Sequence, residues 1–310
     1  MRKNNQKYVI GVDGGGSKTA AVLVSLQGRI LAKHRAGSSH PRNIGIKNAI
    51  ENLAQAIEKV KGNKKIISVF LGLPATEEEF KLKKNLIKRK LLNNKKIAPI
   101  FKGKVVIGSD QLAGFRSGTD EKDGIVLIAG SGSVCHGWKD GKELITDSCG
   151  YLSEAGSAFF VGQKALRAVF KDLDERGKKT LLTKLIFQKL KIKTKEDLIS
   201  LIYSKEPRDV LLSLSVLCDT AAREGDKIAQ SILTEAGREL ALSANTVIRR
   251  LNFRNEKFPL VFIGSMFNSK IILNSTKKEI KKFAPKAEFI RPKVEPVTGA
   301  VRLAIEQLNK

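Results

Sequence analysis

The stretch VDGGGSKTAAVLV, residues 12–24, decides the fold, because it places a glycine-rich loop directly in front of a run of small and β-branched residues. A Walker A loop has the form GxxxxGK[ST], whereas here Ser17 separates Gly16 from Lys18. Walker A loops and dinucleotide-binding GxGxxG loops both lead into a helix, but the residues after this loop have the pattern of a strand. The stretch is therefore predicted to form the tip of a β-hairpin.

A glycine-rich hairpin can still bind phosphate. Without Cβ atoms, the backbone N–H groups can turn inward and form an anion-binding nest, to which the hydroxyls of Ser17 and Thr19 add donors. A tight turn with incidental glycines explains a single hairpin of this kind equally well. The interpretation as a phosphate site needs a second observation.

The second observation is a repeat of the same pattern further along the chain. From residue 7 to residue 60 the sequence predicts two strands joined by the glycine hairpin, a turn at Gly28, a third strand and an amphipathic helix at 47–60. Residues 124–147 again read as strand, Gly/Ser turn, strand, Asp140-Gly141 turn and strand. One supersecondary unit that occurs twice predicts a two-lobed molecule with related halves.

The rest of the pattern completes an α/β chain. Strands are predicted at 64–75 and 103–110 with a lysine-rich helix between them, long helices from 156 to 250, a final strand at 259–270 and a last helix at 297–308. We expect an N-terminal lobe over 1–112 and a C-terminal lobe over 113–310. The final helix, 297–310, is expected either within the second lobe or packed back on the first.

Composition is typical of a globular protein of 310 residues with 42% hydrophobic residues. No apolar run reaches the ~18 residues of a membrane span, and the N-terminal residues lack a signal-peptide pattern, so a cytoplasmic protein without membrane contact is expected. The three cysteines, Cys135, Cys149 and Cys218, form no CxxC pair and fit a reducing compartment.

The charge is strongly positive, with 57 Lys and Arg against 31 Asp and Glu, a net +26. Such a surface attracts polyanions. The lysines are scattered through helical segments and are not interleaved with aromatic residues, so we interpret them as a solvated basic surface without a specific nucleic-acid partner.

Two aspartates end predicted strands. Asp13 precedes the first glycine loop and Asp110 is the last residue of the strand predicted at 103–110. A carboxylate in such a place can hold Mg²⁺ or accept a proton from an attacking hydroxyl. Asp110 has a second interpretation as the N-cap of a helix that starts at Gln111.

Seven segments in chain order together resemble the BadF/BadG/BcrA/BcrD-type ATPases, and among them the branch with the N-acetylglucosamine kinases, in the actin/hexokinase/Hsp70 superfamily. These segments are YVIGVDGGGSKTAAVLV, VIGSDQLAGF, GIVLIAGSGSVCHGW, EAGSAFFVGQKAL, AAREGDKIAQSILTEAGRELA, PLVFIGSMF and PVTGAVRLAI. The resemblance covers nearly the whole chain. It implies a two-lobed, actin-like α/β fold of duplicated ribonuclease H-like domains with a cleft between the lobes.

The resemblance also implies roles for individual residues. Asp13 would be the carboxylate associated with Mg²⁺, and Asp110 the general base that deprotonates the sugar hydroxyl. Residues expected to contact ATP are Gly14, Gly15, Gly16, Ser17, Lys18, Thr19, Gly130, Ser131, Gly132, Ser133, Gly264 and Ser265. Residues expected on the sugar side are His40, Asn43, Ser131, Glu154, Gly156 and Ser157.

The sugar side departs from the family pattern. The family's GGWG stretch is replaced by LITDSCGYL, its GDEGS motif reads SEAGS, and His40 stands where an asparagine precedes proline. The glycines of the ATP side and Asp110 remain. The substrate itself can therefore differ from that of the family.

The resemblance implies an ATP- and Mg²⁺-dependent kinase of an amino sugar or related hexose, and it is compatible with a homodimer. One alternative is the family's other branch, ATP-driven activators of 2-hydroxyacyl-CoA dehydratases, whose iron–sulfur cluster needs cysteines that this chain does not show in suitable places. A second alternative is a nucleotide-dependent sensor without phosphotransfer, which the altered sugar segments favour and the retained Asp110 opposes.

Overall fold

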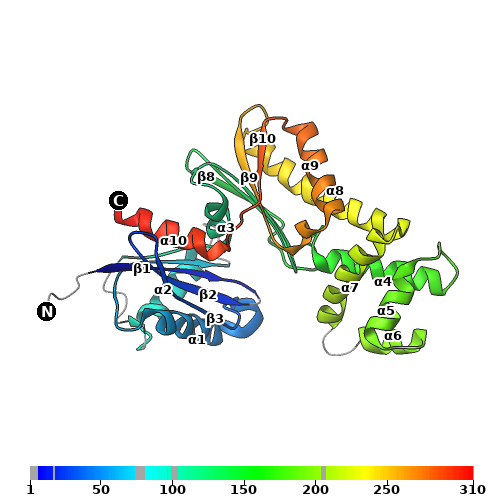
Figure 1. The fold of residues 1–310 in the computed structure, drawn as a ribbon, viewed down its shortest axis with the longest axis horizontal. Coiled ribbons are helices and arrows are strands. Elements are labelled where there is room, and N and C mark those ends of the chain that lie inside the picture. Colours follow the sequence, from blue (N-terminus) through cyan, green and yellow to red (C-terminus); the bar gives the residue numbers. More distant parts are fainter. Residues whose placement is uncertain are drawn as a thin grey trace. The chain divides into compact units, whose positions relative to one another are not determined.

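The computed structural model describes residues 6–16, 18–74, 81–95, 97–98, 104–203 and 207–309. The chain forms two compact units, the first made of Met1–Glu121 and Arg291–Lys310 and the second of Lys122–Ile290 (Figure 1). The chain thus leaves the first unit after residue 121, not after the expected residue 112, because helix α3 (Asp110–Gly118) packs within the first unit. Within the described ranges, no helix combines the length and the hydropathy that crossing a bilayer requires.

The first unit contains a five-stranded mixed sheet in the order β3-β2-β1-β4-β5. Strands β1 to β3 form an antiparallel meander, and β4 and β5 run parallel to β1. Their bounds are β1 Lys7–Gly14, β2 Thr19–Ser25, β3 Ile30–Ala36, β4 Lys65–Leu73 and β5 Lys104–Ser109. The glycine-rich stretch joins β1 to β2, which confirms the predicted hairpin.

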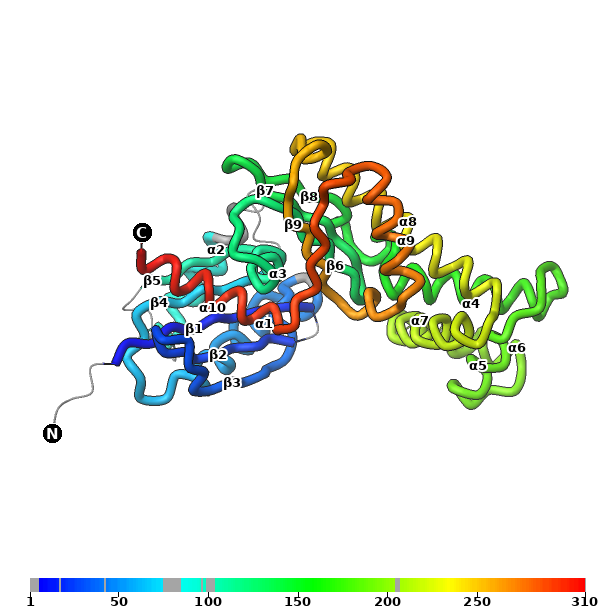
Figure 2. The backbone as a smooth tube through the Cα atoms, turned by 45° about the horizontal axis from the view of Figure 1, so that its top comes forward, coloured from blue at the N-terminus to red at the C-terminus, as the bar shows by residue number. Residues whose placement is uncertain are grey.

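Both faces of this sheet are covered by helices. Residues alternate along β1, so that Ile10 and Val12 pack against α1 (Pro41–Lys61) and α2 (Lys81–Leu92), whereas Val9 packs on the opposite side. On that opposite side lie α3 and the last helix, α10 (Pro296–Glu306). Helix α10 lies alongside β1 in both views of the backbone (Figures 1 and 2). Gly11 permits this approach, because a Cβ there would lie 2.5 Å from the backbone nitrogen of Val301.

The second unit repeats the topology of the first. Its sheet has the order β10-β9-β6-β7-β8, which, counted from the first strand of the unit, is the order of the first sheet. The strands are β6 Gly124–Ala129, β7 Ser133–Lys139, β8 Lys142–Thr146, β9 Phe258–Ile263 and β10 Ala287–Ile290. Asp140 and Gly141 join β7 to β8 with φ of 51° and 76°, the two positive values that a type I′ turn requires. The predicted duplication is confirmed.

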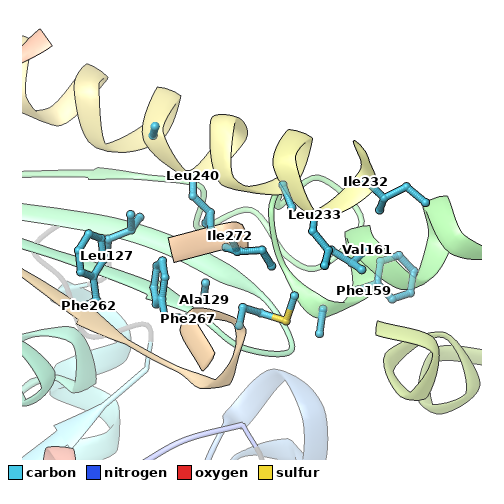
Figure 3. Close-up of a cluster of buried hydrophobic side chains, with 14 of the residues drawn as sticks. Leu127, Ala129, Phe159, Val161, Ile232, Leu233, Leu240, Phe262, Phe267 and Ile272 are labelled. Atoms are coloured by element: carbon cyan, nitrogen blue, oxygen red, sulfur yellow. The ribbon is translucent and has the colours of Figure 1, made fainter. Parts of the chain in front are cut away.

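Helices of the second unit follow β8 and β9. They are α4 Ala158–Leu173, α5 Leu181–Leu190, α6 Lys195–Ile202, α7 Pro207–Arg223, α8 Lys227–Arg250 and α9 Lys270–Phe283, with a short 3₁₀ helix at Ser265–Asn268. Side chains from β6, β9, α4, α8 and α9 meet in one large apolar cluster (Figure 3). Leu127, Phe262 and Leu240 are among its fully buried members. This core fixes the end of β6, from which the second glycine loop extends.

Two sequence expectations about elements were wrong. The strand predicted at 259–270 ends at Ile263, because Gly264 takes a φ of 109° and the 3₁₀ helix follows; it is also not the last strand, since β10 comes after it. The helix predicted from residue 47 begins at Pro41 and is interrupted at Gly45, whose φ of 75° and ψ of 155° are not helical.

Candidate active site

In the first glycine hairpin, which we define as residues 14–19, the described residues before and after Ser17 are hydrogen-bonded to each other. The Gly15 N–H donates to the Lys18 carbonyl at 2.9 Å, and Gly14 pairs with Thr19 at the end of the ladder. Thr19 is fully buried and its hydroxyl donates to the Gly37 carbonyl at 2.8 Å, so this hydroxyl serves the fold. Ser17, one of the predicted phosphate ligands, lies outside the described residues.

The segment between β3 and α1 lies against this hairpin. The Ser39 N–H donates to the Gly15 carbonyl at 3.2 Å, and the Asn43 carboxamide reaches the Gly16 carbonyl at 3.5 Å. His40 accepts from the N–H of Asn43 through its carbonyl, at 3.0 Å. The two predicted sugar-side residues of the first unit, His40 and Asn43, are therefore neighbours of the predicted phosphate loop.

Asp13 and Asp110 stand at the carboxyl ends of β1 and β5, on either side of β4. β1, β4 and β5 are parallel, and their register places Asp13 beside Gly72, and Gly72 beside Gly108, two residues before Asp110. Gly72 makes the approach possible, since a Cβ there would lie 3.4 Å from the Asp110 Cα and 3.0 Å from the Ala113 Cβ. Carboxyl ends of parallel strands are the usual place of ligand sites in α/β proteins.

The two aspartates are held differently. Burial raises the pKa of Asp13 to about 6, while the Lys18 ammonium lowers it and Glu295 raises it. Asp110 is the first residue of α3, and its carboxylate accepts the Gln111 N–H at 3.1 Å. The alternative interpretation of Asp110 as the N-cap was wrong, because Ser109 is the N-cap and accepts the Leu112 N–H at 3.1 Å. Asp110 is therefore not the N-cap of α3.

Lys18 extends from the hairpin toward the start of α10. Its ammonium lies 3.8 Å from a Glu295 carboxylate oxygen, which also accepts from Arg35 at 2.5 Å. Glu295 is the residue that directly precedes α10. The only sequence signal for it was a glutamate in front of Pro296, the pattern of a helix start.

The second glycine hairpin, residues 129–133, joins β6 to β7. Ala129 pairs with Ser133, the Gly130 N–H donates to the Gly132 carbonyl at 2.8 Å, and the Gly130 carbonyl accepts the Ala158 N–H at the start of α4. Ser133 is almost fully buried and its hydroxyl donates to the Ala155 carbonyl at 2.7 Å. Within the part of the chain that the structure describes, the N–H groups of Ser131 and Gly132 make no hydrogen bond.

The segment that precedes α4 holds the predicted sugar-side residues of the second unit. Ser157 is buried and caps α4, accepting the Phe160 N–H at 3.2 Å while donating to the Glu154 carbonyl. Gly156 has a φ of 78°, and a Cβ there would lie 2.5 Å from the Leu240 side chain. Glu154 accepts two backbone N–H groups, from Ser133 at 3.1 Å and Gly150 at 2.9 Å. The helix cap therefore explains the serine at position 157, and the positive φ and the close contact with Leu240 explain the glycine at position 156.

Gly264 and Ser265, the predicted adenosine contacts, lie at the end of β9. Gly264 packs against the second hairpin, because a Cβ there would lie 2.1 Å from the Ala129 carbonyl oxygen. Ser265 is exposed at the start of the 3₁₀ helix. Gly264 and the hairpin are thus in direct contact within the second unit.

The residues that sequence reasoning missed are those whose role depends on tertiary distance. Gly72 carried only the weak signal of a glycine inside an apolar strand run. Asn52 carried none; its carboxamide donates to the Ser38 carbonyl at 2.7 Å and so supports the segment beside the first hairpin. Ser39 is buried beside Gly14, and its hydroxyl has no hydrogen-bond partner among the described residues.

Two α/β units of identical strand order, each with a glycine hairpin between its first two strands, define the actin-like class of ATPase folds. A family model described as the BadF/BadG/BcrA/BcrD ATPase family matches residues 10–304. The chain therefore belongs to this family, and membership implies the use of ATP.

Relatives with assigned activities match nearly end to end. The chain is 31% identical to an N-acetylmuramic acid/N-acetylglucosamine kinase of Clostridium acetobutylicum, over 96% of this chain and 98% of the relative. It is 32% identical to an N-acetyl-D-glucosamine kinase of Dictyostelium discoideum, over 97% and 98%.

Solved structures agree in fold. A candidate N-acetylglucosamine kinase from Chromobacterium violaceum aligns with a TM-score of 0.73 at 20% identity, covering 97% of this chain and 99% of that one. A ROK family glucokinase from Streptomyces griseus, solved with glucose and AMPPNP, aligns with a TM-score of 0.60 at 16% identity, covering 96% and 99%. At these identities the likeness is one of fold.

Proposed function

We propose that this protein transfers the γ-phosphate of ATP to a hydroxyl of an N-acetylated amino sugar, of the class that N-acetylglucosamine and N-acetylmuramic acid represent. What supports the proposal is that Asp13, directly before the first glycine hairpin, and Asp110, directly after β5, stand at the carboxyl ends of parallel strands on either side of Gly72. The two kinase relatives, which align over nearly the whole chain, give the substrate class.

In this proposal Asp110 is the general base. Its carboxylate accepts the proton of the sugar hydroxyl while the hydroxyl oxygen attacks the γ-phosphorus and the bond to the β-phosphate oxygen breaks, leaving ADP. Asp110 is the first residue of α3 and Ser109 supplies the N-cap of this helix, so the proposed base stands directly after the carboxyl end of β5. Phosphoryl transfer otherwise requires mainly positioning and neutralisation of charge.

The two hairpins are the proposed phosphate ligands. The N–H groups of Ser131 and Gly132 are donors for which the described chain offers no acceptor, and Lys18 adds a positive charge at the first hairpin. Gly264 and Ser265 are the proposed adenosine contacts, and His40 and Asn43 the proposed sugar ligands of the first unit. The location of the protein in the cytoplasm and its assembly into a homodimer stay predictions.

Asp13 fits Mg²⁺. A single carboxylate together with substrate phosphates is a common way for proteins to bind this ion. With a pKa of about 6, Asp13 is mostly ionised at neutral pH. Burial makes this negative charge unfavourable, and a bound cation would compensate it. When bound, Mg²⁺ would neutralise charge that develops on the phosphates.

The first experiment measures ADP release from ATP and Mg²⁺ with a panel of sugars: N-acetylglucosamine, N-acetylmuramic acid, N-acetylmannosamine, glucosamine, glucose and none. We expect stimulation by an N-acetylated sugar, with a sugar phosphate identified by mass spectrometry. Turnover that does not depend on any sugar would overturn the proposal.

The general base is tested by the Asp110→Asn variant. We expect kcat to fall by about 10²–10⁴, the range for loss of a general base, with the KM for ATP nearly unchanged. Asp120→Asn is the matched control, because this carboxylate is exposed and pairs with Arg302 at 3.1 Å at the far end of α3. Retained activity in Asp110→Asn would exclude the assigned mechanism.

A further inference from the structure

Glu154 contacts the second glycine hairpin with its carboxylate, although sequence reasoning placed it on the sugar side. One carboxylate oxygen accepts the Ser133 N–H at 3.1 Å and the other accepts the Gly150 N–H at 2.9 Å. The carboxylate therefore joins the hairpin to the segment that leads into α4. Both of its oxygens have a backbone donor.

Gly132 gives the carboxylate its room. A Cβ at this position would lie 2.1 Å from the Glu154 carboxylate oxygen that accepts the Ser133 N–H. Gly132 has no positive φ that would demand glycine for backbone reasons. The contact with Glu154 therefore explains why residue 132 is a glycine.

The surrounding contacts hold the segment of Glu154 in place. The Tyr151 ring packs edge-on against Phe159, with centroids 4.7 Å apart, and the Arg208 guanidinium lies over Tyr151 at 5.1 Å. The Ser133 hydroxyl donates to the Ala155 carbonyl at 2.7 Å, which adds a second link between hairpin and segment.

The electrostatics fit a carboxylate that is held by backbone dipoles. Burial raises the pKa of Glu154, whereas the N–H groups of Gly150 and Ser133 lower it; among neighbouring charges Asp147 raises it and Arg208 lowers it. Hydrogen bonds from N–H groups favour the ionised form, so the two contacts offset part of the cost of burying the charge, and the pKa of Glu154 stays above its ordinary value.

We propose that Glu154 is a positioning residue of the second glycine hairpin. Its carboxylate accepts the Ser133 N–H and so orients the hairpin for the N–H groups of Ser131 and Gly132 to bind ATP phosphate. The nature of this ligand rests on the proposed function. The competing role, a hydrogen bond from Glu154 to the sugar, makes different kinetic predictions.

The first test compares the KM values for the two substrates. Glu154→Ala is expected to raise the KM for ATP about tenfold, the loss expected for a charge-assisted hydrogen bond, and to leave the KM for the sugar within about twofold. His40→Ala and Asn43→Ala should show the reverse pattern. An increase confined to the KM for the sugar in Glu154→Ala would overturn the proposal.

The matched control is Glu235→Ala. Glu235 is a half-exposed carboxylate of the same unit, on α8, that pairs with Lys164 at 2.6 Å. We expect both KM values to stay at the wild-type level. Melting curves by circular dichroism check that each variant folds, and Glu154→Gln, which keeps one accepting oxygen, replaces Glu154→Ala if the latter does not.

A double-mutant cycle tests the contact itself. Gly132→Ala should displace the carboxylate from the Ser133 N–H and reproduce the loss seen in Glu154→Ala, so the double variant should be little worse than either single one. Fully additive losses would mean that the two residues act independently, and would overturn the proposal.

Binding of AMPPNP with Mg²⁺, followed by calorimetry without any sugar, separates this proposal from the proposed function. If the wild type binds the analogue but no sugar stimulates turnover, the proposed function fails while the role of Glu154 is still decided by the variants. Glu154→Ala should then bind the analogue about tenfold more weakly. Equal affinity in wild type and Glu154→Ala would overturn the positioning role.

Discussion

Asp13 combines a partly buried position with a charge that the fold does not fully compensate. Its pKa of about 6 lies above the ordinary value of 3.8, with burial as the main cause. A raised carboxyl pKa of this kind is typical of ligand sites, where a bound ligand offsets the cost of burying the charge. The same feature makes a prediction about the protein without its ligands.

Asp13→Asn should stabilise the metal-free protein at neutral and higher pH. Because the folded pKa is raised, the folded state binds more protons than the unfolded state between about pH 4 and 6, and stability falls as the pH rises through this window. The shift from 3.8 to about 6 corresponds to about 3 kcal/mol above pH 7, a difference that should vanish near pH 4.

The measurement is calorimetric unfolding of wild type and Asp13→Asn in EDTA from pH 4 to pH 8. Comparing the two proteins cancels the titrating groups that do not interact with Asp13; those that do are Lys18 and Glu295. A variant that is less stable than the wild type by the same amount at every pH would contradict the assigned environment of Asp13.

Among the elements, β4 sets the distance between the two aspartates. Gly72 lies between β1 and β5 in the sheet, with the Val12 carbonyl oxygen, the Asp110 Cα and the Ala113 Cβ all within 3.0–3.4 Å of where its Cβ would stand. A methyl group there has room only if α3 moves by a few tenths of an ångström.

Gly72→Ala should therefore reduce catalysis more than it reduces stability. We expect kcat to fall about tenfold or more, because small misplacements of a catalytic group are costly, while stability falls by about 1–3 kcal/mol from overpacking. Gly28→Ala is a control for glycine replacement in general, since it lies in the β2–β3 turn with φ of 83° and should cost stability without lowering kcat. A Gly72→Ala enzyme with unchanged kcat would show that α3 adapts without moving Asp110.

The elements also show how far sequence reasoning reaches. The duplicated meander was predictable because glycine turns and β-branched runs are local signals, and Asp140-Gly141 did form the turn that its sequence predicts. β10 was missed because AEFI is only four residues long and shows no clear alternation. The contact of Glu154 with Ser133 joins residues 21 positions apart in the chain, a distance that no local pattern records.

At the scale of the whole molecule, the first unit is discontinuous in sequence. Its sheet has one face, with Val9, Val22 and Phe70, that is covered by residues of α3 and α10. Arg116 of α3 is almost fully buried and pairs with Glu306 of α10, and Gly299 lets the two helices meet, since a Cβ there would lie 1.9 Å from the Ala113 carbonyl oxygen. Residues 291–310 are therefore part of the core of the first unit.

This arrangement predicts how fragments of the chain should behave. Residues 1–121 alone should not fold stably, because the loss of α10 exposes a buried apolar face of the sheet and leaves the Arg116 charge without Glu306. The same residues joined to 291–310 by a long flexible Gly/Ser linker should fold, and residues 122–290, which carry their own apolar cluster, should fold as well. Circular dichroism melting and amide hydrogen exchange distinguish the cases. Among the fragments that contain β1, cooperative melting and slow exchange in β1 are expected only when α10 is present. A cooperatively folded 1–121 fragment would show that the sheet and its α1 and α2 layer suffice, and that the C-terminal helix only covers a unit already formed.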